Sequence, residues 1–228
     1  MGIIKKFNDF ERGRTLPSPL DLNNPEHRKK AEYHFRWADH AVLRTYWTNF
    51  AEIAPGAYRS NQPDPARWEE YAQMGIKSVI NLRGVSEKAP HFLFEEECTN
   101  RLGMTRYDLS FGARAAPKVQ TLLSLLEIFH KIEKPFLLHC KSGADRAGLA
   151  SAIYQHAIAG RPIEEAQKML SFRFLHLKFT KTGILDLFLA QYAERHIETG
   201  IEFEDWVRTE YDPKALQDAF SKRRIIPL

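Results

Sequence analysis

The stretch LLHCKSGADRAGLA, residues 137–150, decides how the fold of this chain is interpreted. An apolar run ends at His139 and Cys140, and a short polar segment leads into a second apolar run that begins near Arg146. Two apolar runs separated by a glycine-containing loop are typical of a buried strand followed by a helix. The stretch therefore predicts a strand, a tight loop and a helix, with Cys140 at the carboxyl end of the strand.

Short apolar runs alternate with helical patterns from residue 57 to residue 160. The predicted strands cover residues 57–60, 77–84, 104–110 and 135–140. The predicted helices cover residues 66–75, 91–103, 119–132 and 146–160. Such alternation is typical of α/β domains. We therefore predict an α/β fold with a central, mostly parallel sheet flanked by helices.

The segments before and after this alternating region have a different character. The lead-in up to residue 30 is polar and interrupted by prolines, which predicts irregular structure, and residues 31–50 predict a helix. After residue 160 the pattern is helical. We divide the chain into a lead-in with its helix, an α/β core, and a helical extension packed on the core, with the bounds 1–50, 51–165 and 166–228.

The predicted helix at 31–50, AEYHFRWADHAVLRTYWTNF, is rich in aromatic side chains. Helical spacing makes Trp37, Ala41, Tyr46 and Trp47 candidates for one packed face. Such a face is typical of a helix that packs on its own domain or of one that lies on a membrane surface. We favour packing on the domain and do not expect membrane contact.

The composition of the 228 residues is that of an ordinary globular protein, with 43% hydrophobic and 27% charged residues. The formal charge of +4 is compatible with an anionic ligand. The two cysteines exclude a disulfide framework and favour a reducing compartment. The amino-terminal segment lacks the apolar core of a secretory signal. We expect a cytoplasmic protein with no nucleic-acid partner, whose basic end at 222–228 is a solvated tail.

The loop after Cys140 has the features of an anion site. Ligands of open α/β sheets bind at the carboxyl ends of the strands. Backbone N–H groups of the loop and of the following helix start form an anion cradle, for which Gly143 provides conformational freedom. Arg146 can hold an oxyanion with two parallel hydrogen bonds, and this positive environment favours the thiolate form of Cys140. The chemistry indicated is attack of sulfur on phosphorus to form a phosphocysteine that water hydrolyses.

The segment HCKSGADRAG resembles the HCx5R signature of cysteine-based protein tyrosine and dual-specificity phosphatases. The resemblance extends over roughly residues 55–160, where PGAYRSNQP and IKSVINLRG are similar to the opening strands of small bacterial and atypical dual-specificity members. It implies that Cys140 is the nucleophile, that Arg146 binds the phosphate and the transition state, and that His139 orients the loop and tunes the cysteine. It implies no metal or organic cofactor. The backbone donors that it implies are Lys141, Ser142, Gly143, Ala144 and Asp145.

The general acid that protonates the leaving oxygen has two candidates. Asp108 lies 32 residues before Cys140, which resembles the placement in dual-specificity phosphatases. Asp145 lies inside the loop, which resembles phosphoinositide phosphatases of the myotubularin kind. The sequence alone does not decide whether Asp108 or Asp145 is the general acid.

One position departs from the family pattern. The family usually has Ser or Thr directly after the arginine, where the hydroxyl assists hydrolysis of the phosphoenzyme, and this chain has Ala147. We therefore expect slow breakdown of the phosphocysteine, unless the Ser142 hydroxyl substitutes.

The family default for the substrate is phosphotyrosine or another dual-specificity substrate. Lys141 and three arginines on segments near the same rim favour a strongly anionic substrate, such as a phosphoinositide, an inositol phosphate or a phosphorylated glycolipid. These arginines are Arg59, Arg83 and Arg114. Because of Ala147, a phosphate-binding module with poor turnover is a further alternative.

Overall fold

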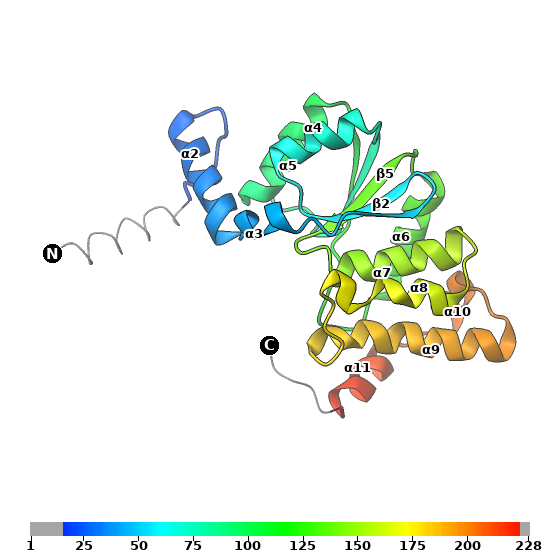
Figure 1. Cartoon of the computed structure of the whole chain (residues 1–228). Coiled ribbons are helices and arrows are strands. Elements are labelled where there is room, and N and C mark those ends of the chain that lie inside the picture. Colours follow the sequence, from blue (N-terminus) through cyan, green and yellow to red (C-terminus); the bar gives the residue numbers. More distant parts are fainter. Residues whose placement is uncertain (1–15, 224–228) are drawn as a thin grey trace.

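The structure, a computed structural model, describes residues 16–223 (Figure 1). Its centre is a five-stranded sheet with the order β1-β2-β5-β3-β4, in which β1 is antiparallel to β2 and the remaining pairs are parallel. The strands are β1 (Ala51–Ala54), β2 (Ala57–Asn61), β3 (Ser78–Asn81), β4 (Thr105–Asp108) and β5 (Phe136–Cys140). The predicted α/β class with a mostly parallel sheet is confirmed.

The central strand β5 is buried on both faces, as expected for a parallel strand covered by helices. Alternate side chains point to opposite faces, so Phe136, Leu138 and Cys140 belong to one core while Leu137 lies in the other. In register, Asn61 of β2 lies opposite Cys140 and Asn81 of β3 lies opposite His139. The carboxyl ends of three parallel strands therefore meet at Cys140.

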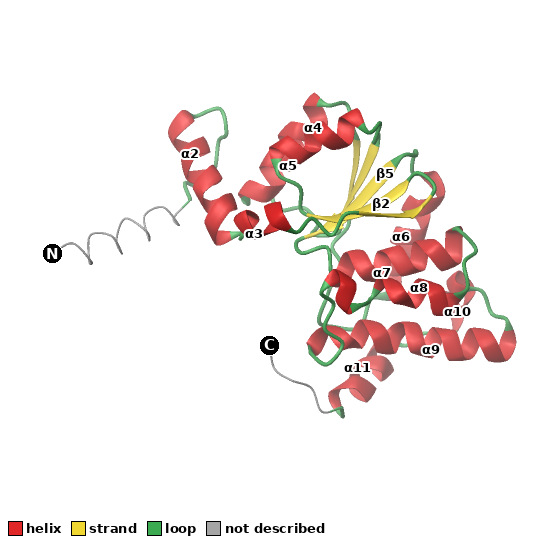
Figure 2. Ribbon diagram, in the orientation of Figure 1, coloured by secondary structure: helices red, strands yellow, loops and turns green. Residues whose placement is uncertain are grey.

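Helices cover both faces of the sheet (Figure 2). Helices α4 (Pro65–Gln73) and α5 (Pro90–Arg101) contribute Trp68, Tyr71 and Cys98 to one core. On the other face, α6 (Val119–Lys131) and α7 (Asp145–Ile153) pack against β5. The predicted helices of the alternating region are thus present to within a few residues at their ends, except that α7 continues as a π-helical segment, Tyr154–Ile158.

The chain after α7 packs on the α6–α7 side (Figure 1). The apolar side chains Phe188, Tyr192, Phe203 and Trp206 belong to the same core as β5 and α6. A long irregular segment with 3-10 turns links α8 to α9. The helices are α8 (Ile163–Ala166), α9 (Ile184–Thr199), α10 (Phe203–Thr209) and α11 (Pro213–Ser221). None of the helices between residues 16 and 223 is long and apolar enough to cross a membrane.

The amino-terminal helix differs from the prediction. It starts earlier, as α2 (Pro25–Tyr33), because the Asn24 side chain accepts from the Glu26 amide at 2.9 Å and caps it. It continues as a π-helical turn and breaks at His40, whose φ of 61° is left-handed, before α3 (Ala41–Tyr46). The predicted irregular lead-in is wrong for residues 25–30. Residues 1–15, and the end of the basic tail at 224–228, lie outside the described part of the chain.

The face with which this segment packs also differs from the prediction. Phe35 and Ala41 are buried against Phe94 of α5, with the two phenyl rings 5.8 Å apart. Trp37 and Tyr46 are instead 51% and 90% exposed, and Trp47 is 37% exposed. The break at His40 is the physical reason, since one continuous helical face does not pass through it. Of the four candidates, Ala41 alone is buried.

Strand β1 was missed by the sequence reasoning. It has only four residues and forms a hairpin with β2 across Pro55 and Gly56, where the glycine has a φ of +72°. The Pro-Gly pair between two short runs was the available signal.

Candidate functional site

Cys140 lies at the carboxyl end of β5, and its side chain is buried, with a relative exposure of 1%. The loop 141–144 follows it, and α7 begins at Asp145. The predicted succession of strand, loop and helix is therefore present. A cavity of about 530 Å³ opens over this loop, and Lys141, Ser142 and Arg146 are among the residues that line it.

The carbonyl groups of this loop are bonded outward, to the surrounding protein. The Lys141 carbonyl accepts from the Gln62 amide at 3.2 Å, and the Ser142 carbonyl accepts from Asn49 Nδ2 at 2.9 Å. Arg59 Nη2 donates to the next two carbonyls, those of residues 143 and 144. Because C=O and N–H point in opposite directions across a planar trans peptide, the N–H groups that follow these carbonyls face the concave side. This is the arrangement of an anion cradle.

Gly143 is required by both conformation and space. Its φ of +72° lies in the left-handed region. A Cβ placed there would lie 2.7 Å from Asn49 Cβ and 2.7 Å from the Asn61 nitrogen. The loop thus packs directly on the end of β2 and on the segment that follows α3.

Arg59 supports the loop from beneath and is fully buried. Its guanidinium lies 3.8 Å from the centre of the Phe174 ring and donates to the Met169 carbonyl at 2.9 Å. Burial lowers the pKa of Arg59 to about 10, and its electrostatic interactions with Cys140 and Asp145 oppose this shift. Arg59 therefore holds the loop, and it is not among the cavity-lining residues.

Arg146 lies on the first turn of α7 and lines the cavity. Its Nη1 donates to the Leu82 carbonyl at 3.3 Å, which uses one of the five N–H groups of the guanidinium. The half-buried side chain is thereby held at the mouth of the cradle, where an oxyanion would lie.

His139 points to the opposite face of the sheet from Cys140. Its Nε2 lies 3.0 Å from Glu95 Oε1, and Gln62 Nε2 donates to Glu95 Oε2 at 2.7 Å. Burial alone would raise the pKa of Glu95, but the interactions with His139 and Gln62 outweigh it, and the pKa is lowered. His139 therefore ties β5 to α5.

The two acid candidates have different surroundings. Asp145 lines the cavity, whereas Asp108, like the buried Cys140, is not among the residues that line it. Asp108 lies at the end of β4, where Asn81 Nδ2 donates to its Oδ1 at 2.8 Å and Arg106 Nε donates to its Oδ2 at 3.1 Å. Both oxygens of Asp108 are thus occupied by donors from the sheet.

Asp145 takes part in a three-residue network that the sequence reasoning missed. His176 Nδ1 lies 2.8 Å from Asp145 Oδ1, and its Nε2 lies 2.6 Å from Asp186 Oδ2. Burial would lower the pKa of His176, but the two carboxylates outweigh it and raise the pKa to about 9. No signal in the sequence marks this network, because His176 lies in irregular structure and Asp186 lies on α9.

A second group of charges lies at the rim and brings in the amino-terminal segment. Asp39 pairs with Arg83 at 2.9 Å, with Arg44 at 2.7 Å and with Lys141 at 3.3 Å. Burial opposes ionisation of Asp39, but Arg83, Arg44 and Lys141 hold its pKa well below the usual range. Arg83 is therefore part of a buried ion-pair cluster, whereas Arg114 is exposed and lines the cavity.

The position after Arg146 is buried and carries no hydroxyl. Ala147 has a relative exposure of 0%, and its carbonyl accepts from Ser151 Oγ at 2.6 Å. Ser142 is exposed, and its Oγ accepts from the Ala144 amide at 3.3 Å. Among residues 16–223, no group of three or more His, Cys, Asp or Glu side chains is arranged to hold a metal ion.

A known protein family matches the part of the chain that contains this site. The sequence model of the tyrosine phosphatase family matches residues 48–165. Comparison with curated protein sequences gives no match.

The structure is similar to solved structures at identities that show the fold alone. TpbA from P. aeruginosa is 18% identical, covers 77% of this chain and 92% of its own, and has a TM-score of 0.50. Tk-PTP in its active form is 19% identical, and the match covers 65% of this chain and 98% of Tk-PTP, with a TM-score of 0.51. The core catalytic domain of SIW14 from S. cerevisiae, described as a PP-IP phosphatase, is 16% identical, with coverages of 68% and 96% and a TM-score of 0.50.

Proposed function

Since the chain belongs to the tyrosine phosphatase family, we propose that it hydrolyses phosphomonoesters through a phosphocysteine formed on Cys140. The observation that carries the proposal is the loop 141–144, whose carbonyls are bonded outward so that its N–H groups face the cavity. Arg146 lies at the rim of the same cradle. Cys140 precedes this loop at the end of β5, so we expect its sulfur to attack a phosphoryl group bound by the loop.

The reaction proceeds in two displacements. In the first, the Cys140 thiolate attacks phosphorus, the bond to the ester oxygen breaks, and that oxygen receives a proton from the general acid. In the second, water attacks the phosphocysteine while the same group, now a base, accepts the water proton. Inorganic phosphate leaves, and the thiolate and the protonated acid are restored. The inward N–H groups and Arg146 stabilise the equatorial oxygens in both steps.

Asp145 is the acid in this proposal. It lines the cavity, whereas both oxygens of Asp108 are occupied by donors from the sheet. The proton resides on the Asp145–His176 pair: His176 carries it at rest, and transfer to Asp145 places it beside the leaving oxygen. Asp186 stabilises the imidazolium until the proton moves. Asp108 remains the second candidate.

The substrate is a phosphotyrosine or dual-specificity type phosphomonoester. A more anionic substrate, such as a phosphoinositide, an inositol phosphate or a phosphorylated glycolipid, is the second candidate. It is favoured by Arg114 and Lys141, which line the cavity beside Arg146. SIW14, the structural relative described as a PP-IP phosphatase, is in line with it.

A phosphate-binding module with poor turnover is the alternative from another class. Ala147 supports it, because the hydroxyl that assists phosphoenzyme hydrolysis in the family is missing. The retention of Cys140 in a buried, preformed cradle favours the enzyme.

The test is phosphate release from an aryl phosphate with a chelator present. We expect release by the wild type and none by Cys140→Ser, while the matched variant Cys98→Ser, changed at the other buried thiol, keeps its activity. With an alkyl phosphate, whose leaving oxygen needs protonation, Asp145→Asn should be more damaging than Asp108→Asn. Release that survives in Cys140→Ser contradicts the proposal, and tight vanadate binding without any release selects the binding module.

A further inference from the structure

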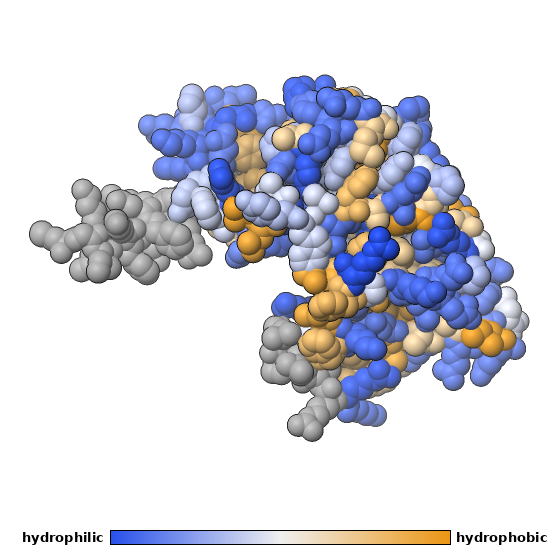
Figure 3. Space-filling model, viewed as in Figure 1, coloured by the Kyte–Doolittle hydropathy of each residue, from blue (hydrophilic) through white to orange (hydrophobic). Residues whose placement is uncertain are grey.

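The rim of the cavity carries exposed apolar side chains from two segments distant in sequence. From α3 and the residue after it, Leu43 and Trp47 line the cavity and Tyr46 is 90% exposed. From the segment between α8 and α9, Leu175 lines the same cavity and Phe172 is 72% exposed. Figure 3 shows apolar residues over α3 and over this segment on one face of the molecule.

A shared hydrogen-bonding residue fixes these two segments beside the phosphate cradle. Asn49 Nδ2 donates both to the Ser142 carbonyl of the loop, at 2.9 Å, and to the Phe174 carbonyl, at 3.0 Å. Trp47 Nε1 donates to Asn49 Oδ1 at 2.7 Å. The two apolar segments therefore have fixed positions on the wall of the site, and we call them together the apolar rim (residues 40–51 and 170–181).

One of the two segments of the apolar rim also carries exposed positive charge. Residues 170–181 contain no Asp or Glu and include three exposed cations, Arg173, Lys178 and Lys181, whereas Arg44 of the other segment is buried and paired with Asp39. The Arg173 guanidinium lies 5.4 Å from the centre of the Phe174 ring. Exposed aromatic residues interspersed with Lys and Arg are the combination that binds anionic lipid surfaces, because the rings enter the headgroup region and the cations attract its phosphates.

We propose that the apolar rim docks on a bilayer containing anionic phospholipid, and that the phosphomonoester enters the cradle from that surface. The phosphate is bound by the loop and Arg146, while Leu43, Trp47 and Leu175 contact the apolar part of the same amphiphile. The identity of the substrate as a membrane-borne phosphomonoester rests on the proposed function. The docking itself is independent of the proposed function, because it involves surface side chains that take no part in the chemistry.

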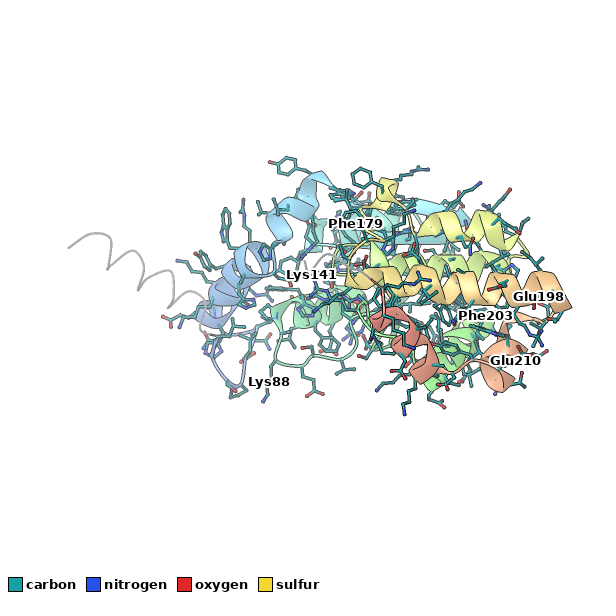
Figure 4. All side chains as sticks on the ribbon, turned by 90° about the horizontal axis from the view of Figure 1, so that it is seen from below. Lys88, Lys141, Phe179, Glu198, Phe203 and Glu210 are labelled. Atoms are coloured by element: carbon teal, nitrogen blue, oxygen red, sulfur yellow. The ribbon has the colours of Figure 1, made fainter. Side chains whose placement is uncertain are left out.

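The docking is tested with Cys140→Ser protein, so that catalysis does not alter the lipid. The probes are vesicles of phosphatidylcholine alone or mixed with phosphatidic acid, whose headgroup is a phosphomonoester. We expect co-sedimentation with the mixed vesicles, weakened about tenfold by each of Tyr46→Ser and Phe172→Ser, the factor that 1.4 kcal/mol produces. The matched control is Ile197→Ser, which removes an apolar side chain of similar exposure, 69%. It lies on α9 next to Glu198, which Figure 4 labels at the end of the molecule remote from Lys141.

The proposal is overturned if the mixed vesicles are not bound, or if the two rim variants bind them as well as Ile197→Ser does. It is also overturned if binding requires a phosphoprotein in place of lipid. In a second arm, which uses proteins that keep Cys140, phosphate release is measured from vesicle-borne phosphatidic acid and from a soluble aryl phosphate. The ratio of the two rates is compared between the wild type and each variant. We expect this ratio to fall in both rim variants and to hold in Ile197→Ser. If the wild type does not hydrolyse the aryl phosphate, the proposed function is refuted. The vesicle-binding result then decides the docking by itself.

Discussion

The network Asp145–His176–Asp186 gives the sharpest prediction, which concerns the pH dependence of catalysis. An isolated carboxyl group keeps its proton only to about pH 4, so it is a poor acid at neutral pH. The pKa of His176 is raised to about 9 because two carboxylates, at 2.8 and 2.6 Å, outweigh the effect of burial. A raised pKa means that the proton is held as the pH rises. The acid-dependent rate should therefore persist through neutral pH and fall only as the pH passes about 9.

His176→Gln keeps a hydrogen-bonding side chain but removes the imidazolium that supplies the proton. At neutral pH we expect hydrolysis of an alkyl phosphate to fall by about 10² to 10⁴, the usual contribution of a general acid. An aryl phosphate with an acidic phenol should lose much less, because its leaving oxygen needs little protonation. Asp186→Asn removes one of the two carboxylates, so the alkaline limb should move down by about 1 to 3 pH units.

The assay is kcat/KM against pH for both substrates, with His156→Gln as the matched control. His156 also pairs with a neighbouring side chain, Tyr192, at 2.7 Å, but it lies in the π-helical segment that follows α7 and is not among the cavity-lining residues. The pH profile separates a chemical role from a structural one, because simple misfolding lowers the rate at every pH. A His176→Gln profile with the wild-type alkaline limb would show that His176 does not supply the proton. A loss of the alkyl phosphate rate confined to Asp108→Asn would show that Asp108 is the acid.

The same network has a consequence for stability that can be measured without substrate. The pKa of His176 rises on folding from 6.5 to about 9, so its contribution to stability is complete below pH 6.5 and is lost as the pH rises through 9. The difference in melting temperature between wild type and His176→Gln should therefore be largest in acid and smallest above pH 9. A difference that does not change with pH would contradict the ionised network.

Three further predictions concern the loop and its support. Ala147→Ser supplies the missing hydroxyl, so phosphoenzyme hydrolysis should accelerate by roughly 10- to 100-fold, as one hydrogen bond to a charged group allows. Rapid-quench kinetics should show a stoichiometric burst in the wild type and a smaller one in the variant, and a wild type without a burst would contradict this. Gly143→Ala should lower the free energy of unfolding by about 1 to 3 kcal/mol and abolish phosphate release. The control is Gly103→Ala, at a residue with a φ of +67° and no atom within 4 Å of an added Cβ. It should be destabilised only by the left-handed backbone conformation and should keep its phosphate release. Arg59→Lys loses the two-carbonyl contact, and we expect weaker vanadate binding in a calorimetric titration, while equal binding would show that the cradle is formed without it.

The sequence predicted those parts of the fold that depend on local pattern. The alternation of short apolar runs with helical periodicity is a local property, and it placed β2 to β5 and α4 to α7 within a few residues. The hairpin strand β1 was missed because four residues give too short a pattern, and its pairing with β2 is a tertiary feature. The helix at 31–50 was predicted as continuous because nothing in its composition reveals the left-handed residue at His40.

The candidate site was predictable to the extent that it lies on one contiguous segment. Cys140, the loop and Arg146 are neighbours in sequence, so the strand–loop–helix pattern brought them together. The groups that hold them come from elsewhere: Arg59 from β2, Asn49 from the segment after α3, and His176 from the irregular segment before α9. Their roles depend on contacts over long sequence separations, which periodicity and spacing do not report.

The phosphocysteine on Cys140 is tested most directly by trapping it. Wild-type protein is mixed with an aryl phosphate and quenched in acid, and the peptide containing Cys140 is examined by mass spectrometry. We expect a phosphoryl adduct on Cys140 in the wild type that is absent in Cys140→Ser and unaffected by Cys98→Ser. Steady phosphate release with no adduct at any quench time, or an adduct on another residue, would contradict this expectation.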